Sequence, residues 1–175
     1  ETIVLVHKWG QAASEGTVVN AHYDLACCTH EIIGLIGLGQ RFGSQLIREE
    51  ENMDVKDTAF MMRRAAMSSA LGANALRWLS SSEDVSRESR IRESGYKETT
   101  DRIGLALGQK GRNGKSGKDA ANNMVQAMRN AVDEDGARLT EQEVIDEFIT
   151  FRGAGHETTS NTLSWALLLL AQHQD

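Results

Sequence analysis

The sequence contains no proline among its 175 residues, although average usage of about 5% would give roughly nine. That absence suggests an edited or artificial sequence. The only two cysteines, Cys27 and Cys28, are adjacent in an apolar stretch, which excludes a disulfide framework and a spaced zinc site. Basic residues are outnumbered 25 to 19, for a net charge of −6, whereas a nucleic-acid binder needs a concentrated basic face. We therefore expect no nucleic-acid partner and no metal held by side chains.

The sequence also lacks a long apolar run. Its longest, residues 165–171, falls far short of the ~20 residues that span a bilayer. Residues 1–7 are acidic with a short apolar core, unlike a signal peptide, which opens with basic residues. We therefore expect a soluble segment with no membrane span.

Apolar residues recur three and four positions apart in several stretches, and no stretch sustains apolar/polar alternation. This pattern predicts helices with one buried face. We expect an all-α fold, a multi-helix bundle with one long central helix at its C-terminal end, formed by a single segment, residues 1–175. The expected helices are residues 2–14, 23–38, 54–71, 85–107, 119–132 and 140–173. We expect an irregular connection at residues 72–84 and an exposed, glycine-rich basic loop at residues 108–117.

The last expected helix begins at Thr140, whose hydroxyl can cap the Glu143 amide while the Glu143 carboxylate reaches back. Its pattern continues to His173, so the helix would be about 50 Å long at 1.5 Å per residue. Only Gly153 and Gly155 weaken its middle, where glycine costs up to ~1 kcal/mol relative to alanine. Weakness at the centre of a long buried helix indicates a functional reason.

The residues around these glycines read Ala154-Gly155-His156-Glu157-Thr158-Thr159. They resemble the cytochrome P450 family, whose long central helix carries Ala/Gly-Gly-x-Asp/Glu-Thr-Thr/Ser over the heme, and every specified position matches. The resemblance continues upstream in chain order. Residues 18–46 resemble helix E and its exit, residues 76–79 and the charged stretch after them resemble the F–G connection and helix G, and residues 118–136 resemble helix H. The chain is thus similar to an internal segment of the family, helices D to I, with the N-terminal β-region and the heme-ligand half absent.

The resemblance implies a heme-dependent monooxygenase that uses O2 to insert one oxygen atom into a small apolar substrate, with electrons from a reductase partner. The catalytic candidates are Thr158, which would hydrogen-bond the oxygen species at the heme, and Glu157, which would relay protons. The Thr158 hydroxyl can also bond the Ala154 carbonyl four residues earlier and so distort the helix, leaving a groove for oxygen and water. The cofactor-binding candidates are Ala154, Gly155, Thr158 and Thr159, because small side chains let the heme approach. The competing interpretation is structural: Thr158 only bonds back to its helix, Glu157 is solvated and the glycines are tolerated.

The family holds its heme iron by a cysteine thiolate in a Phe-Gly-rich loop far downstream of this helix, preceded by a Glu-x-x-Arg helix. Neither pattern occurs here, and Cys27 and Cys28 lie upstream. We therefore expect the chain alone to be an incomplete, inactive fragment, with no iron ligand of its own. The alternative is a non-catalytic or artificial helical protein that has a family-like sequence and no heme. A complete enzyme would be either anchored in the endoplasmic reticulum membrane or cytoplasmic.

Several positions depart from the family pattern, including the prolines expected after Leu79 and after His173, where serine and Gln174 stand instead. Arg152 stands where the family usually has an apolar residue, on a stripe that we expect to face the core. That stripe contains Phe148, Thr159 and Leu163. A buried unpaired charge costs several kcal/mol, so Arg152→Leu is expected to stabilise the fold. His30 interrupts an apolar face, where a satisfied core or surface histidine is the ordinary interpretation.

Two other motifs are near misses. Gly114-Lys115-Ser116 resembles the end of a phosphate-binding loop, but the required first glycine falls on Gln109. His156-Glu157 resembles a zinc-protease helix, but Ser160 replaces the second histidine. We reject both.

Overall fold

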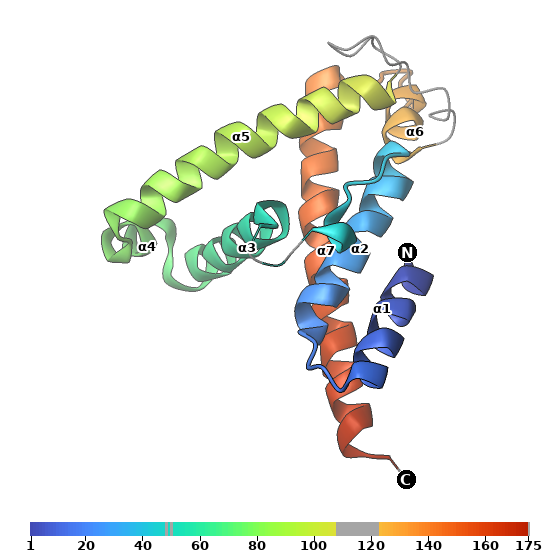
Figure 1. Cartoon of the computed structure of the whole chain (residues 1–175). Coiled ribbons are helices and arrows are strands. Elements are labelled where there is room, and N and C mark those ends of the chain that lie inside the picture. Colours follow the sequence, from blue (N-terminus) through green and yellow to red (C-terminus); the bar gives the residue numbers. More distant parts are fainter. Residues whose placement is uncertain (48, 50, 108–122, 175) are drawn as a thin grey trace.

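The computed structural model describes residues 1–47, 49, 51–107 and 123–174 (Figure 1). These residues form seven α-helices, one 3-10 turn and no strand, which confirms the expected all-α class. The elements are α1 Thr2–Glu15, α2 Ala21–Leu38, η1 Ser44–Leu46, α3 Met53–Leu71, α4 Ala73–Leu79, α5 Ser82–Ala106, α6 Met124–Asn130 and α7 Glu141–Gln172. The glycine-rich loop and the rejected phosphate-loop motif fall at residues 108–122, outside the described residues.

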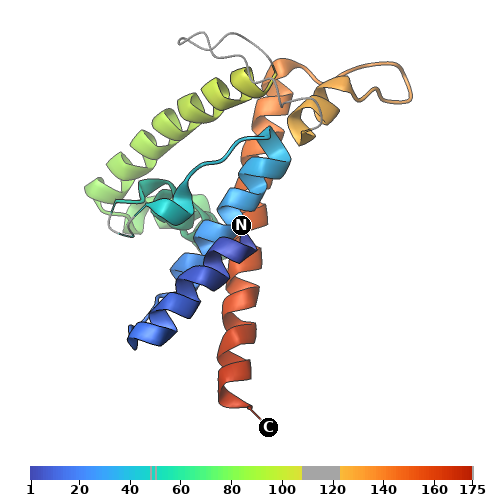
Figure 2. The ribbon, with the colours of Figure 1, turned by 45° about the vertical axis from the view of Figure 1, so that its right-hand side comes forward.

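The longest helix, α7, is the axis of the arrangement, and its interface with α2 is the most extensive in the structure. The C-terminal end of α5 meets the first turns of α7, and the other end of α5 lies away from the axis, beside α4 and α3 (Figures 1 and 2). The C-terminal end of α7 extends beyond the other helices in both views. The long central helix expected from the sequence is therefore confirmed.

The start of α7 is fixed by the predicted capping box. The Thr140 hydroxyl accepts a hydrogen bond from the Glu143 amide at 3.2 Å, and the Glu143 carboxylate accepts one from the Thr140 amide at 2.7 Å. Thr140 also lowers the pKa of Glu143, because its backbone and side chain both donate to the carboxylate. In α2 the Asn20 side chain accepts from the Tyr23 amide at 3.1 Å, and the helix ends at Gly39, whose φ of 67° suits glycine.

Two sequence expectations about helices were wrong in part. Within residues 72–84 the irregular connection expected at residues 80–82 is present at Ser80 and Ser81, but α4, which was not expected, occupies most of this stretch, after Gly72. The fifth helix was expected at residues 119–132, but within the described residues α6 covers only Met124–Asn130. Asn123 begins it by accepting a hydrogen bond from the Gln126 amide at 2.9 Å, since asparagine favours caps over helix interiors.

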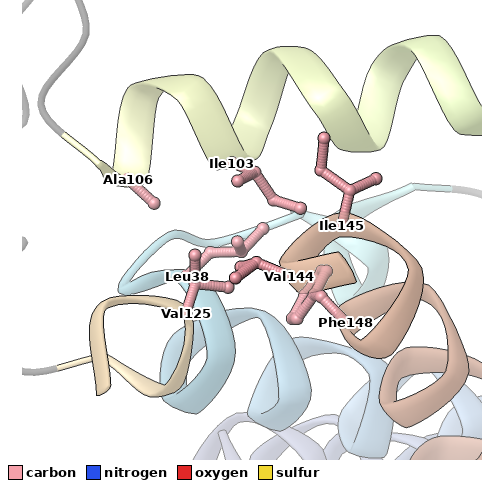
Figure 3. Close-up of a cluster of buried hydrophobic side chains, with 7 residues drawn as sticks. All are labelled: Leu38, Ile103, Ala106, Val125, Val144, Ile145 and Phe148. Atoms are coloured by element: carbon pink, nitrogen blue, oxygen red, sulfur yellow. The ribbon is translucent and has the colours of Figure 1, made fainter. Parts of the chain in front are cut away.

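The main apolar cluster lies where α2, α5, α6 and α7 meet (Figure 3). Its buried members are Leu38, Ile103, Ala106, Val125, Val144, Ile145 and Phe148. The Phe148 ring lies against Gly37 of α2, and a Cβ atom at Gly37 would collide with it. This contact fixes the position of α7 along the axis of α2. It thereby also fixes the position of residues 154–159, which follow on α7.

Candidate functional site

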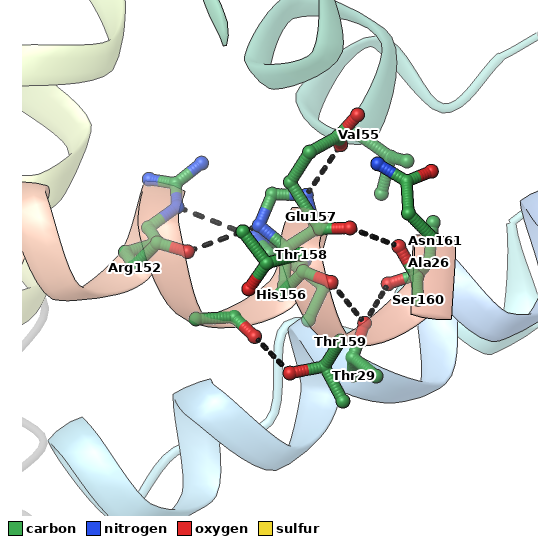
Figure 4. Close-up of polar contacts among 12 residues, drawn as sticks. Ala26, Thr29, Val55, Arg152, His156, Glu157, Thr158, Thr159, Ser160 and Asn161 are labelled. Atoms are coloured by element: carbon green, nitrogen blue, oxygen red, sulfur yellow. Dashed lines mark hydrogen bonds and ion pairs between the residues drawn. The ribbon is translucent and has the colours of Figure 1, made fainter. Parts of the chain in front are cut away.

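One face of α7 is buried along Phe148, Arg152, His156 and Ser160, which follow one another at intervals of four residues. Side chains four apart form the ridge that fits between the ridges of a neighbouring helix. Across this interface the Thr29 hydroxyl of α2 donates toward the His156 carbonyl at 3.1 Å (Figure 4). The buried ridge thus determines which side of the motif remains open.

The open side carries the predicted catalytic hydroxyl. Ala154, Thr158 and Thr159 are exposed. The Thr158 hydroxyl donates to the Ala154 carbonyl at 2.8 Å, as predicted, and the Thr159 hydroxyl donates to the Gly155 carbonyl at 2.8 Å. The predicted distortion is absent, because α7 continues as α-helix through these turns. A carbonyl oxygen has two lone pairs, so it can accept from a hydroxyl and from the backbone amide together.

Gly155 faces α2 rather than open space. A Cβ atom there would lie 2.8 Å from Cδ1 of Ile33. The missing side chain therefore lets α2 and α7 pack closely, which is a reason for this glycine that the sequence did not reveal.

Glu157 lies between the two faces of α7, with a side chain that is 16% exposed. Its Oε2 atom is turned inward and lies 3.8 Å from Nε2 of His156, a ring that is fully buried. Glu157 is therefore not the fully solvated charge of the structural interpretation. One carboxylate oxygen of Glu157, the residue expected to relay protons, thus lies close to the His156 ring.

Arg152 is buried, as predicted, but the prediction that its charge is unpaired was wrong. Its Nε donates to Nε2 of His30 at 3.3 Å and its Nη1 donates to the Thr99 hydroxyl at 3.1 Å. Its guanidinium carbon also lies 5.5 Å from the centre of the Phe42 ring, within cation–π range. The charge is thus held by α2, α5 and the segment after α2.

The prediction that Thr159 and Leu163 share a buried stripe with Arg152 was also wrong, because both residues are exposed. The buried side chains follow a spacing of four, whereas the predicted stripe added residues 7 and 11 positions after Arg152. The crossing of α2 over α7 selects the ridge at this point, and a helical period read from the sequence cannot specify the crossing.

His30 is fully buried and is the polar group that sequence reasoning undervalued. Its Nδ1 lies 2.8 Å from the Ser44 hydroxyl, and its ring stacks on Phe42 with centroids 4.4 Å apart. Burial, together with the charge of Arg152, lowers the pKa of His30 from 6.5 to about 2, so the ring is neutral. Its Nε2 then accepts from Arg152 while Nδ1 donates to Ser44. His30 and Arg152, the two polar residues that fall on expected apolar faces, are partners, and that coincidence was the available signal.

Neither cysteine is placed to bind a metal. Cys27 and Cys28 are buried in α2, and burial raises the pKa of both thiols. Within the described residues, no group of three or more His, Cys, Asp and Glu side chains could hold a metal ion.

A cavity of about 680 Å³ opens between α3, α5 and α7. Its apolar lining includes Met61, Met62, Ile91 and Ile149, and Arg152 lies at its wall. This volume lies in the ordinary range of small-molecule pockets.

Apolar side chains are exposed along the last turns of α7, where Trp165 and Leu170 are each 66% exposed. None of the helices in the described part of the chain combines the length and apolarity that a bilayer crossing requires.

Comparison with known proteins agrees with the resemblance seen in the motif. A family model described as Cytochrome P450 matches residues 1–175. The self-sufficient cytochrome P450 monooxygenase CYP505E5 of Aspergillus kawachii is 29% identical over 168 residues, which make up 95% of this chain and 15% of that protein. Cytochrome P450 CYP749A22 of Panax ginseng is 37% identical over 86 residues, or 49% of this chain and 14% of that protein. Ent-kaurenoic acid oxidase 1 of Arabidopsis thaliana is 36% identical over 52 residues, or 30% of this chain and 11% of that protein.

The matched regions span only 11% to 15% of the length of these three relatives. The match of the family model nevertheless extends over the whole chain, including the buried ridge and the open hydroxyl face of α7. This chain belongs to the cytochrome P450 family.

Proposed function

We propose that this chain belongs to a heme-dependent monooxygenase and forms the surface that faces the O2-binding side of the heme. Thr158 and Glu157 are its proposed proton-transfer residues. The observation that carries the proposal is the asymmetry of the motif. Ala154 and Thr158 remain exposed while His156 and Ser160, on the same turns, are fully buried. The exposed Thr158 hydroxyl beside the small Ala154 side chain leaves room for a flat cofactor to pack against α7.

The residues on the open face fit contact with one side of a heme. Ala154 leaves room for close approach, and Thr158, four residues later, presents its exposed hydroxyl on the same side of α7, while the exposed Thr159 is turned about 100° around the helix. Gly155 contributes mainly by letting α7 pack closely against α2. Cys27 and Cys28 do not fit the role of iron ligand, because both are buried against other helices. In the proposal, the iron ligand therefore comes from outside this chain.

A bound heme supplies the reductive activation of O2, by which one oxygen atom enters the substrate and the other leaves as water after two electrons and two protons are added. The Thr158 hydroxyl can donate one hydrogen bond outward while its oxygen accepts a replacement proton. Its bond to the Ala154 carbonyl, at 2.8 Å, holds the hydroxyl in place when it is not donating outward. Glu157 is the adjacent carboxyl that can supply the replacement proton.

The cavity between α3, α5 and α7 is the proposed space for an apolar organic substrate. The methionine and isoleucine side chains that line it support this assignment. Methionine adapts its shape to irregular apolar ligands. Electrons would come from a reductase, as the family membership implies.

The test compares Thr158→Val with Thr159→Val in a complete cytochrome P450 that carries this segment. Valine keeps the shape of threonine and removes the hydroxyl. General acid–base groups contribute about 10²- to 10⁴-fold, so Thr158→Val should sharply lower product formed per reduced nicotinamide and raise the peroxide released. Thr159→Val is the matched control and should change both yields much less. Equal yields in the parent and Thr158→Val would reject the role of Thr158.

A further inference from the structure

Apolar and charged side chains both line the cavity between α3, α5 and α7. The apolar lining, which includes Met61, Met62 and Ile149, suits the hydrocarbon body of a ligand. In pockets of this kind a few polar groups fix the orientation of the ligand and select its end group. The charged residues on the lining therefore decide which class of molecule the cavity can take.

Two of the three carboxylates on the lining are already paired with arginines. Asp57 of α3 lies 2.9 Å from Arg87, and Glu98 of α5 lies 2.7 Å from Arg102. Each arginine offsets the charge of its partner before any ligand arrives. These two carboxylates therefore offer a ligand little net charge.

The two arginines on the lining are also engaged. Arg92 lies 2.7 Å from Glu88, one turn earlier on α5. Arg152 is buried, and its guanidinium donates to His30 and to Thr99. An anionic ligand would have to compete with these contacts.

The third carboxylate on the lining, Asp146 of α7, is exposed. Its Oδ1 atom accepts a hydrogen bond from Nε2 of Gln142 at 2.9 Å, and this partner is neutral. Among the residues that the structure describes, no cation forms an ion pair with Asp146. Because a carboxylate has about four lone-pair sites, Asp146 can accept further hydrogen bonds from a ligand.

The Tyr96 side chain of α5 lies close to this carboxylate. The same Gln142 nitrogen donates to the Tyr96 hydroxyl, so one side chain links Tyr96 to Asp146. Tyr96 also lines the cavity and is 38% exposed. The face of a tyrosine ring attracts a cation within about 6 Å of its centre. A carboxylate and an aromatic ring thus share one part of the lining.

We propose that the cavity binds a protonated amine with an apolar body, and that Asp146 accepts hydrogen bonds from its ammonium group. The inference rests on the cavity being the substrate space of the proposed function, and it narrows the substrate to basic molecules. An ammonium group has three donors and no acceptor, which matches a carboxylate that still has lone pairs to share. The net charge of −6 also favours the approach of a cation over that of an anion.

The test compares phenylbutylamine, phenylbutanol and phenylbutyrate, which carry similar apolar bodies and a positive, neutral or negative end. Each is titrated into the isolated chain, labelled with ¹³C at the methionine methyl groups, and the Met61 and Met62 signals are followed by NMR. Exposed ion pairs contribute modestly, so the amine should bind roughly three- to fivefold more tightly than the alcohol. The carboxylate should bind most weakly.

Two matched variants assign the preference to one residue. Asp146→Asn keeps the shape of the side chain and removes its charge, so the amine and the alcohol should then bind about equally. Glu147→Gln removes the charge of the next residue, which is exposed but does not line the cavity, and should keep the preference. Loss of the preference in both variants would overturn the proposal, because it would show attraction to the charge of the whole chain.

The remaining outcomes separate this inference from the proposed function. An alcohol that binds as tightly as the amine, or a carboxylate that binds most tightly, would overturn the amine assignment and keep the cavity as an apolar binding site. Failure of all three probes to shift the Met61 and Met62 signals would overturn both the amine assignment and the substrate role of the cavity. The coupling of Thr158→Val tests the proton-transfer role of the open face and does not depend on any of these results.

Discussion

The middle of α7 and its last turns have the reverse of the usual polarity. After Phe148 the buried ridge holds Arg152, His156 and Ser160, whereas the exposed last turns hold Trp165 and several leucines. A surface helix normally shows its polar side to water. Polar groups can be buried on α7 because hydrogen bonds satisfy them, such as those from Arg152 to His30 and Thr99. The difference teaches that polar contacts orient the middle of α7 on α2, whereas the last turns expose apolar side chains.

The largest effect expected from this comparison is at Phe148. It is fully buried, so Phe148→Ala should lower the free energy of unfolding by about 3–5 kcal/mol. Trp165→Ala, on the exposed part of the same helix, should stay within about 0.5 kcal/mol of the parent. Urea unfolding followed by circular dichroism measures both. Similar losses in the two variants would mean that the last turns of α7 are covered in solution.

The polar part of the ridge can be tested with a double-mutant cycle. Arg152→Leu and His30→Leu should each lower the free energy of unfolding by about 1–3 kcal/mol, because each leaves a buried polar partner unsatisfied. The double variant should lose less than the sum of the single losses. This reverses the sequence-based expectation that Arg152→Leu stabilises the chain. A stabilised Arg152→Leu, or strictly additive losses, would contradict the pairing.

The neutral ring of His30 predicts a pH dependence. Its pKa is about 2 in the folded chain and near 6.5 when unfolded, so the unfolded chain binds the extra proton between these values. Stability should therefore fall as the pH drops below about 6.5, at up to about 1.4 kcal/mol per pH unit from this group. In His30→Gln that contribution should vanish, and the two proteins should respond alike between pH 7 and 8. The free energy of unfolding of the parent and of His30→Gln is measured by urea unfolding at pH 7, 6 and 5. An equally steep loss in both would mean that groups other than His30 cause the pH dependence.

The sequence predicted the elements of the fold better than their contacts. The capping box at Thr140, the end of α2 at Gly39 and the length of α7 depend on local residues, and all were confirmed or closely matched. Short helices were harder to predict, because α4 is stabilised partly by burial of Leu76 in the folded chain. A window of sequence cannot show that burial.

Within the site, the bond from Thr158 to the Ala154 carbonyl followed from a spacing of four residues on one helix. The partners of Arg152 did not, because His30 and Thr99 are 122 and 53 residues away in the sequence. Their approach depends on how α2 and α5 cross α7. The packing role of Gly155 against Ile33 was hidden for the same reason.

The claim that the motif has one open and one buried side can be tested directly by thiol labelling. Thr158→Cys and Ser160→Cys place a thiol on the exposed and buried sides of neighbouring turns, and the native Cys27 and Cys28 are buried. In native conditions, a water-soluble disulfide reagent should label Thr158→Cys nearly as fast as the urea-unfolded chain and should label Ser160→Cys far more slowly. Equal rates at the two positions, or faster reaction at position 160, would contradict the orientation of α7 on which the proposed function depends.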